Sequence, residues 1–431
     1  MKKRFGCMMA GVMAISMLAG VSMVQAEGVE LNVTTTFAGE DGNARNFKDA
    51  VAAWEETTGN KVNDASATSD ETFKARVEMD FQTGADPDVL FFFNGADANS
   101  FIEAGKVVSI DTIREEYPEY AANMNDDLIP ASVVDGIRYA VPVNGYWEAM
   151  FVNTEVLEAS GVDIPGADYT WDVFLEDCQK IKDAGYAPIA AALGNIPHYW
   201  WEFCIFNNGD VANHMTIPAS IEEAVAWVSG MEDIKTLYEA GYFPENTLSA
   251  TDDETFASFV DGKAAFLIDG SWKVGGIAGA CQSDPEDAST LDAEKLDRFT
   301  VTYVPGKGER KATDLIGGLS MGYYISTAAW EDEAAVSFVE YMTSDEMVAE
   351  FAQHTASALK TAPEVDEASF NSLQLKAMNM MSGVTSLTGA VQDLFSGECR
   401  VSTFDGMPQI VTGEVTAEDA VAEGLAIYNE Q

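Results

Sequence analysis

The residues best suited to catalysis form one recognisable motif, and its setting argues against a catalytic role. Gly318-Leu319-Ser320-Met321-Gly322 fits the GxSxG pattern, in which a serine nucleophile stands on a sharp turn between a strand and a helix. Segment 323–327 instead continues as strand-like sequence, and the only histidine after Ser320 is His354, in a run that reads as helix. We therefore interpret the match as chance.

Metal and carboxylate chemistry find no specific support either. His198, His214 and His354 form no close pair and no HExxH signature, so the sequence predicts no metal and no cofactor. With 71 acidic residues, two carboxylates at glycosidase separation are expected by accident. The acidic content is therefore uninformative about hydrolysis.

The cysteines are spaced too widely for a metal cluster or redox motif. Four cysteines lie after residue 26, and no two of them form a CxxC pair: Cys178, Cys204, Cys281 and Cys399. Four cysteines allow three complete disulfide pairings, and the sequence does not choose among them. Cys178 falls on the apolar face of a predicted helix, where we expect a buried free thiol.

Strand and helix signals alternate along the chain and would position any binding site. Residues 31–37 read as a strand, and Phe47, Val51 and Trp54 recur at helical spacing. The run 89–93, Val-Leu-Phe-Phe-Phe, is typical of a buried parallel strand. This pattern predicts an α/β architecture.

The second half repeats the alternation. Thr170 is a plausible N-cap for a helix that ends near Gly185, and strands are expected over 188–193, 259–268 and 299–304. Further helices are expected around 334–342 and after Thr416, with Asp419 at the third helical position. No internal repeat and no low-complexity linker is evident, so we expect interwoven lobes.

The N-terminus predicts export. Lys2, Lys3 and Arg4 precede an apolar run over residues 8–24 and a small-residue exit, so we expect a signal peptide over residues 1–26, cleaved after Ala26. A permanent membrane span is the weaker interpretation, since polar and glycine residues interrupt the run. Leu18-Ala19-Gly20 is followed by Val21, and Cys7 comes too early, so no lipobox cysteine is expected.

Charge and size narrow the class further. Removing residues 1–26 leaves 405 residues with a net charge of (24 − 3) − 71 = −50. Such a surface repels nucleic acid and anionic lipid. Because one hydrophobic core rarely supports more than roughly 250–300 residues, two lobes are expected.

Several short segments share their order with a known family. They are Trp54-x4-Gly59-x-Lys61-Val62, Pro87-Asp88-Val89, Phe101-x3-Gly105-Lys106, Pro142-x10-Asn153, Pro165 through Thr170-Trp171, Ala184-Gly185-x2-Pro188-Ile189-Ala190, Phe259-x2-Gly262-Lys263-Ala264-Ala265, Gly270-Ser271-Trp272, Ile316-Gly317-Gly318 and Gly413-Glu414-x-Thr416-x2-Asp419-Ala420. Together they resemble the sugar-binding extracellular solute-binding proteins of ABC importers, the family of maltose-binding protein.

The resemblance implies a type II periplasmic-binding-protein-like fold, with a ligand cleft between two lobes joined by hinge crossings. Carried onto this chain, the crossings are expected near Asn144, Thr302 and Thr343. The N-lobe would then comprise residues 27–143 plus 303–343. The C-lobe would comprise residues 144–302 plus 344–431.

A sugar presents hydroxyls and an apolar face of C–H groups, so its site needs aromatic platforms and polar side chains. Trp272 matches the family position that stacks on sugar, although a core tryptophan behind the strand is the alternative. Tyr146 and Trp147 follow the first crossing and point opposite ways if they lie in a strand. Tyr146 aligns better with the family contact, and Trp147 is equally compatible with the core.

The cluster His198-Tyr199-Trp200-Trp201 follows Pro197 in an expected loop where the family places an aromatic contact. We select His198 and Trp201 as ligand-binding residues, with Trp200 packing in the interior. Asp269 could accept hydrogen bonds from hydroxyls, or only cap its turn. Gly318 would let backbone approach the ligand, or only relieve a tight turn.

Candidates from the N-lobe follow strand ends, where open α/β sheets bind ligands. Phe37 and Glu40 lie at the end of the first strand, and Asn94 and Asp97 lie at the end of the Phe-rich one. Asn94-Gly95 is also an ordinary turn signal.

The leading hypothesis is a monomeric extracytoplasmic protein that binds a carbohydrate, expected to be an oligosaccharide, and presents it to an ABC importer permease. One alternative is a polyamine or other cation as ligand, which the acidic composition favours. Against it, the expected cleft is richer in aromatics and amides than in carboxylates. The second alternative is a secreted carbohydrate-acting enzyme.

Overall fold

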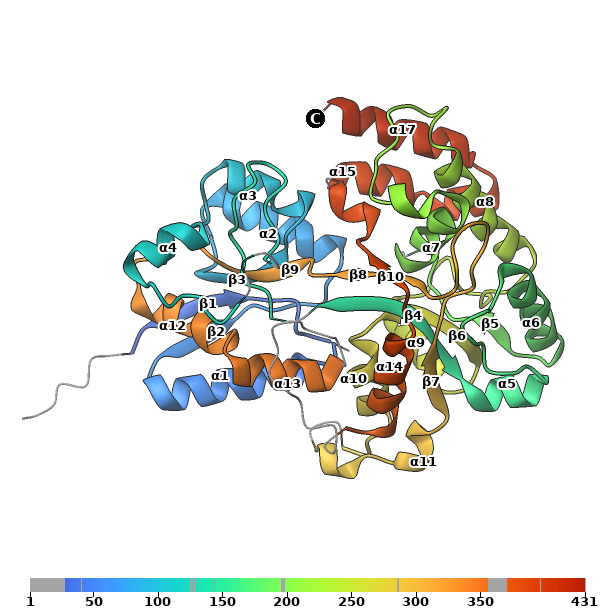
Figure 1. Ribbon diagram of the computed structural model, residues 1–431, viewed down its shortest axis with the longest axis horizontal. Helices are drawn as coiled ribbons and strands as arrows, with labels where there is room; N and C mark the ends of the chain where they lie inside the picture. The colour runs from blue at the N-terminus through green and yellow to red at the C-terminus, as the bar shows by residue number, and fades with distance from the viewer. Residues whose placement is uncertain are drawn as a thin grey trace, which may run out of the picture.

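The computed structural model describes residues 28–430 apart from positions 40, 125, 127–128, 144, 195–197, 285–286, 356–369 and 396. Two α/β lobes are each built on their own sheet, and the chain passes between them in the centre of Figure 1. We call them the first lobe, which holds the N-terminal strands, and the second lobe, which holds the C-terminal helix α17 (Ala417–Glu430). The predicted two-lobed α/β architecture is confirmed.

The sheet of the first lobe has the order β2 (Lys61–Asp64), β1 (Glu30–Thr34), β3 (Val89–Phe93) and β9 (Met321–Ile325). The first three strands run parallel, and β9 is antiparallel to β3. Alternate β3 side chains enter two cores, with Phe91 on one face and Leu90 and Phe92 on the other. A strand covered on both faces needs apolar residues at every position, which explains the Phe-rich run.

The sheet of the second lobe has the order β10 (Ser386–Thr388), β8 (Asp314–Gly318), β4 (Tyr146–Asn153), β6 (Ala264–Gly270) and β5 (Ala187–Ile189), and β7 (Phe299–Thr302) also pairs with β4. Strand β4 is central and antiparallel to β6, β7 and β8. Every residue of β4 after Tyr146 is buried. This strand therefore anchors the second lobe directly where the chain enters it.

Helices cover both faces of each sheet. Those of the first lobe are α1 (Ala44–Thr58), α2 (Glu71–Thr83), α3 (Asn99–Glu103), α4 (Ile110–Glu116), α12 (Glu333–Met342) and α13 (Asp345–Thr355), with the 3-10 turn η1 (Ala96–Ala98). Those of the second are α5 (Thr154–Ser160), α6 (Trp171–Asp183), α7 (His198–Asn208), α8 (Val225–Glu239), α9 (Asp252–Val260), α10 (Lys273–Ala280), α11 (Ala293–Leu296), α14 (Ser372–Ser382), α15 (Gly397–Arg400), α16 (Met407–Thr412) and α17, with the short turns η3 (Val211–Asn213), η4 (Ala288–Thr290), η6 (Val391–Leu394) and η7 (Val401–Asp405).

Two predicted helix starts are confirmed by their caps. The hydroxyl of Thr170 accepts a hydrogen bond from the backbone N–H of Val173 at 3.4 Å. The hydroxyl of Thr416 accepts from the N–H of Asp419 at 3.0 Å and donates to the Asp419 carboxylate at 2.7 Å. These caps satisfy N–H groups that have no partner within the helix.

The ends of two expected strands differ from the structure. Strand β1 stops at Thr34, and Phe37 follows in a turn in which its N–H donates to the hydroxyl of Thr35 at 3.0 Å. Phe259 lies in helix α9, and the strand begins only at Ala264, after Gly262 at φ 74°. Both apolar runs cross an element boundary, which periodicity alone does not reveal.

The chain passes from the first lobe to the second between Val143, which packs in the first core, and Tyr146, which begins β4. The expected crossing at Asn144 lies outside the described residues. The return differs from the expected position near Thr302, because β7 and β8 both pair with β4. The chain reaches the first sheet between Gly318 and Met321, so residues 303–318 lie with the second lobe.

The last passage also comes later than Thr343. In helix α13, Met347, Val348 and Phe351 still pack in the first core, and Phe351 contacts the Phe37 ring at a centroid distance of 5.1 Å. Helix α14 then packs in the second core. The intervening residues 356–369 lie outside the described part of the chain.

All four described cysteines are free thiols and buried, as expected for Cys178. Within the described ranges, no helix combines the length and apolar character needed to cross a membrane. The signal-peptide prediction concerns residues 1–26, which are not among the described residues.

Candidate ligand-binding site

A cavity of about 220 Å³ lies between the lobes. The first lobe contributes the turn after β1, the start of α2 and the loop between β8 and β9. The second lobe contributes the start of β4, the end of β6 with the start of α10, and parts of α7, α9 and η6. A ligand in this cavity would contact both lobes at once.

The second lobe presents an aromatic wall built on the end of β6. Trp272 lies partly exposed in the cavity and packs at 54° to Tyr199, with ring centroids 6.0 Å apart. A Cβ atom on Gly270 would lie 2.1 Å from the Trp272 ring, so only glycine lets the indole fold back over the strand end. Tyr146 extends the same wall. The motif Gly270-Ser271-Trp272 therefore has a steric reason for its composition.

Seven aromatic residues among those described line the cavity: Phe37, Phe91, Phe93, Tyr146, Tyr199, Phe256 and Trp272. Two of the rings lie close to lysine ammonium groups. The Lys74 Nζ lies 4.5 Å from the centroid of Phe93, and the Lys273 Nζ lies 4.3 Å from the centroid of Phe256. The first lobe thus supplies Lys74 and the second lobe supplies Lys273.

Carboxylates are as numerous as aromatics, with seven lining the cavity: Asp41, Asp70, Glu148, Asp252, Asp253, Asp269 and Asp393. Among the described residues, Asn43 and Gln392 add amide groups to the lining. Aromatic and amide side chains together therefore outnumber carboxylates in the described lining, in agreement with the expectation, although carboxylates alone are as numerous as aromatics.

Burial changes the protonation of several of these acids. It raises the pKa of Asp41 to about 6, with a hydrogen bond from the Asn43 N–H and the charge of Lys273 acting in the opposite direction. Burial also raises the pKa of Asp393 to about 7, with Lys74 opposing the shift. The pKa of Glu148 rises well above its usual range because the carboxyl is buried near Glu202, Asp393 and Asp269. Near neutral pH the Asp393 carboxyl is therefore protonated in part of the molecules, and a protonated carboxyl can donate as well as accept hydrogen bonds.

Three buried oxygens of the lining have no hydrogen-bond partner among the described residues. They are Asn43 Oδ1 in the first lobe and Glu148 Oε2 and Gln392 Oε1 in the second. The residues are 2%, 1% and 9% exposed. A buried polar atom without a partner costs roughly 1–3 kcal/mol, and a ligand hydroxyl could supply the missing bond.

Comparison with protein families decides the class of the chain. The family model of the bacterial extracellular solute-binding proteins matches residues 40–349. The chain belongs to this family. Such a solute-binding protein acts outside the cytoplasm, as the leader predicted. A comparison with curated proteins gave no match.

Solved structures show the same fold as this solute-binding protein. A chitin oligosaccharide binding protein superposes with a TM-score of 0.77 at 20% identity, covering 94% of this chain and 99% of that one. The substrate-binding protein Lmo0181 from Listeria monocytogenes, in complex with cycloalternan, has a TM-score of 0.70 at 16% identity and coverages of 94% and 98%. RafE in complex with raffinose has a TM-score of 0.67 at 17% identity and coverages of 93% and 99%.

Four of the ligand-binding residues expected in this solute-binding protein line the cavity: Phe37, Tyr146, Asp269 and Trp272. The Asp269 Oδ1 accepts a hydrogen bond from the backbone N–H of Gly270 at 2.7 Å, and the Asp269 Oδ2 lies 3.8 Å from the Lys273 Nζ. Glu40 and the side chain of His198 lie outside the described part of the chain. Whether any of the four contacts ligand remains a prediction.

Two expected tryptophans lie in the core instead. Trp147 points to the opposite face of β4 from Tyr146 and stacks near Phe151, with centroids 6.1 Å apart. Trp201 stacks on Phe404 at 3.5 Å between centroids and 7° between planes. The expected loop is in fact helix α7, and its helical turn directs Tyr199 to the cavity and Trp201 to the interior.

Asn94, Asp97 and Gly318 are near the cleft but are not part of the cavity lining. The Asn94 Oδ1 accepts from the Tyr324 hydroxyl at 3.1 Å. Asp97 forms ion pairs with Lys74 at 3.2 Å and with Arg400 at 2.7 Å. Gly318 ends β8 opposite Tyr146 and has extended backbone.

The residues missed from sequence differ in whether a signal existed. Glu148 lies two positions after Tyr146 and therefore shares its strand face. Lys273 adjoins Trp272, and Asp41 lies in the turn that follows β1. Gln392 and Asp393 reach the cavity from η6, more than two hundred residues from β4, and no local pattern indicates that placement.

Proposed function

We propose that this solute-binding protein captures a carbohydrate, in the form of an oligosaccharide, in the cavity between its lobes. The observation that carries the proposal is the combination of seven aromatic side chains with buried, unpartnered oxygens from both lobes. Aromatic faces pack on sugar C–H groups, and sugar hydroxyls can donate to Asn43, Glu148 and Gln392. The chitin oligosaccharide, cycloalternan and raffinose named for the similar structures support the same class of ligand.

The acidic lining favours a second candidate, a polyamine or other organic cation. Seven carboxylates face two lysines in the cavity. Against this candidate, Lys74 and Lys273 place a positive charge from each lobe beside the space that a cation would occupy. Carboxyl groups with raised pKa values also suit neutral hydroxyls better than ammonium groups.

A thermal-shift screen of residues 27–431 tests these candidates directly, because a ligand that binds only the folded state raises the unfolding midpoint. We expect a selective rise with one oligosaccharide, confirmed by calorimetric titration. A rise with spermidine or putrescine alone would replace the carbohydrate with a cation. No response to either class would contradict both.

We further propose that the protein is a monomer that hands its ligand to an ABC importer permease and does not convert it. Ser320, of the GxSxG match, lies between strands β8 and β9, so a strand and not a helix comes directly after it. Chromatography of the bound glycan after long incubation should recover it unchanged. Uptake of the labelled glycan by cells lacking this protein should fall, and mass spectrometry of the exported chain should show Glu27 as its first residue.

A further inference from the structure

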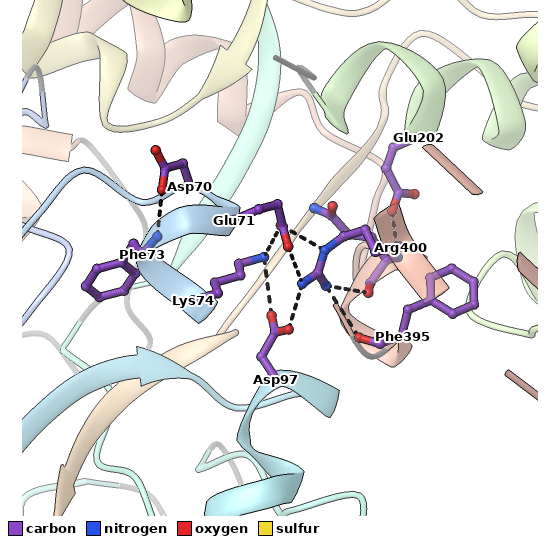
Figure 2. A network of polar contacts seen from close by, with 9 residues as sticks. Asp70, Glu71, Phe73, Lys74, Asp97, Glu202, Phe395 and Arg400 are labelled. Atoms are coloured by element: carbon purple, nitrogen blue, oxygen red, sulfur yellow. Dashed lines mark hydrogen bonds and ion pairs between the residues drawn. The ribbon is translucent and has the colours of Figure 1, made fainter. Parts of the chain in front are cut away.

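The lobes meet beside the cavity at a buried arginine. Arg400 belongs to α15 of the second lobe and is fully buried. Its Nε donates to Glu71 Oε1 at 2.9 Å, and its Nη2 donates to Glu71 Oε2 at 3.0 Å and to Asp97 Oδ1 at 2.7 Å. Figure 2 shows Glu71 and Asp97, both from the first lobe, around the guanidinium group.

The contacts of Arg400 divide by lobe. Within the described part of its own lobe it donates to the backbone carbonyls of Gln392 and Phe395, each at 3.4 Å. The short, charged bonds all cross to the first lobe. Burial alone would lower the pKa of Arg400, but the nearby Asp97 and Glu71 carboxylates raise it. The contact between the lobes therefore supplies most of the charged partners that the buried guanidinium group requires.

The same carboxylates reach the ligand cavity through one more side chain. Lys74 lies 3.1 Å from Glu71 and 3.2 Å from Asp97, and it also lines the cavity. On the side of the second lobe, Gln392 bonds to Arg400 through its carbonyl and also lines the cavity. The ion-pair cluster and the cavity thus share a wall.

Close backbone packing occurs at the same place. A Cβ atom on Gly95 of the first lobe would lie 2.1 Å from the Asp393 carbonyl oxygen of the second lobe. Such an approach exists only while the lobes are together.

We propose that Arg400 is a positioning residue that holds the lobes in the closed, ligand-retaining arrangement by pairing with Glu71 and Asp97, and that Lys74 links this pairing to the cavity. The inference rests on the proposed function, which places the ligand between the lobes. We call Arg400, Glu71, Asp97 and Lys74 the Arg400 latch. Opening the lobes separates Arg400 from both carboxylates, so each charged bond lost on opening favours the closed form.

The test measures the distance between the lobes in ligand-free protein, so it needs no knowledge of the ligand. Spin labels are attached to cysteines introduced at Met79 of the first lobe and Val173 of the second, which are 58% and 43% exposed. The native cysteines are buried and should not label. We expect Arg400→Met to raise the open-to-closed ratio by about tenfold or more, seen as a longer interlobe distance.

Arg310→Met is the matched control. Arg310 is also a buried arginine, but its partners, Asn207 Oδ1 and the carbonyls of Val304, Pro305, Lys311 and Asp314, all lie in the second lobe. It should cost stability and leave the interlobe distance unchanged. If Arg400→Met unfolds the chain, the pair Glu71→Gln and Asp97→Asn tests the same contact from the first lobe.

Wild-type distances in Arg400→Met, or in the Glu71 and Asp97 variants, would overturn the proposal. An equally long distance in Arg310→Met would also overturn it, since the opening would then reflect general damage. A glycan screen without response contradicts the proposed function and leaves the distances unaffected, so the two failures can be told apart.

Discussion

The two lobes meet around the cavity in two physically different ways. At the Arg400 latch, charged side chains cross between lobes, and Gly95 packs against the Asp393 backbone. Near Trp272, Gly42 of the first lobe packs against second-lobe backbone, where an added Cβ would lie 2.6 Å from the Trp272 carbonyl oxygen and 3.0 Å from the Gly275 Cα. We call this second place the Gly42 contact.

The two contacts between the lobes are expected to have different effects. Paired charges give a strong, directional interaction that is lost once the groups separate, whereas a backbone contact fixes only how closely the lobes approach. At the Gly42 contact the neighbouring polar bond is weak, with Arg45 Nη2 donating to Gln282 Oε1 at 3.4 Å. We therefore expect the latch to govern the energy of closure, and the Gly42 contact to govern the fit around Trp272.

The largest expected effect on affinity comes from adding a methyl group between the lobes beside the Arg400 latch. Gly95→Ala should open the lobes and lower the affinity for the glycan selected in the screen by about 100-fold, because the added methyl meets fixed backbone and overpacking costs about 1–3 kcal/mol. Calorimetry measures the affinity. Gly279→Ala, where a Cβ meets no atom within 4 Å, should leave it unchanged. Equal affinities for both variants would contradict the close approach at Gly95.

Removing the aromatic platform should have a smaller effect on affinity and none on closure. Trp272→Ala should weaken glycan binding by about tenfold to thirtyfold, since a stacked aromatic contributes about 0.5–1.5 kcal/mol beyond the area it buries. The interlobe distance of the ligand-free protein should stay at its wild-type value. Trp201→Phe, in the core, should lower the unfolding midpoint without changing affinity. Full affinity in Trp272→Ala would remove Trp272 from the site.

An added methyl group should lower affinity less at the Gly42 contact than beside the Arg400 latch. Gly42→Ala should reduce affinity by about tenfold, less than Gly95→Ala, because its nearest atom is 2.6 Å away compared with 2.1 Å. A larger loss than that of Gly95→Ala, measured in the same titration, would reverse the ranking of the two contacts.

The smallest expected effect is a pH-dependent one at Asp393. Its pKa is raised from 3.8 to about 7, chiefly by burial, so wild-type protein should lose stability as pH rises from about 4 through 7. Asp393→Asn lacks this loss, so its unfolding midpoint should rise relative to that of wild type over the same pH range. We expect the free energy of unfolding of the variant to increase relative to wild type by about 1 kcal/mol between pH 5 and 7, because solvent screens this partly exposed side chain. A constant difference between the two proteins would contradict a raised pKa.

Features that depend on residues close together in the chain could be predicted from the sequence. Strand β3, helix α6 and the Thr416 cap were predictable because apolar spacing and capping residues act over one or two turns. The family motifs placed Trp272 and Tyr146 at the cavity for the same local reason. The assignment of Trp201 to the cleft failed because a segment that was expected to be a loop folds as helix α7, which rotates consecutive residues by about 100°.

The two-lobed α/β architecture and the family could be predicted from the chain alone, because alternation of elements and ordered motifs are properties of the chain. The three-dimensional fold was needed to place residues 303–318 in the second lobe, because strand pairing depends on which partner is available across the sheet. It also decided that Arg400 meets Glu71 across 329 positions and that Asp393 faces the cavity. Contacts between groups so far apart depend on how the lobes dock, which no local pattern encodes.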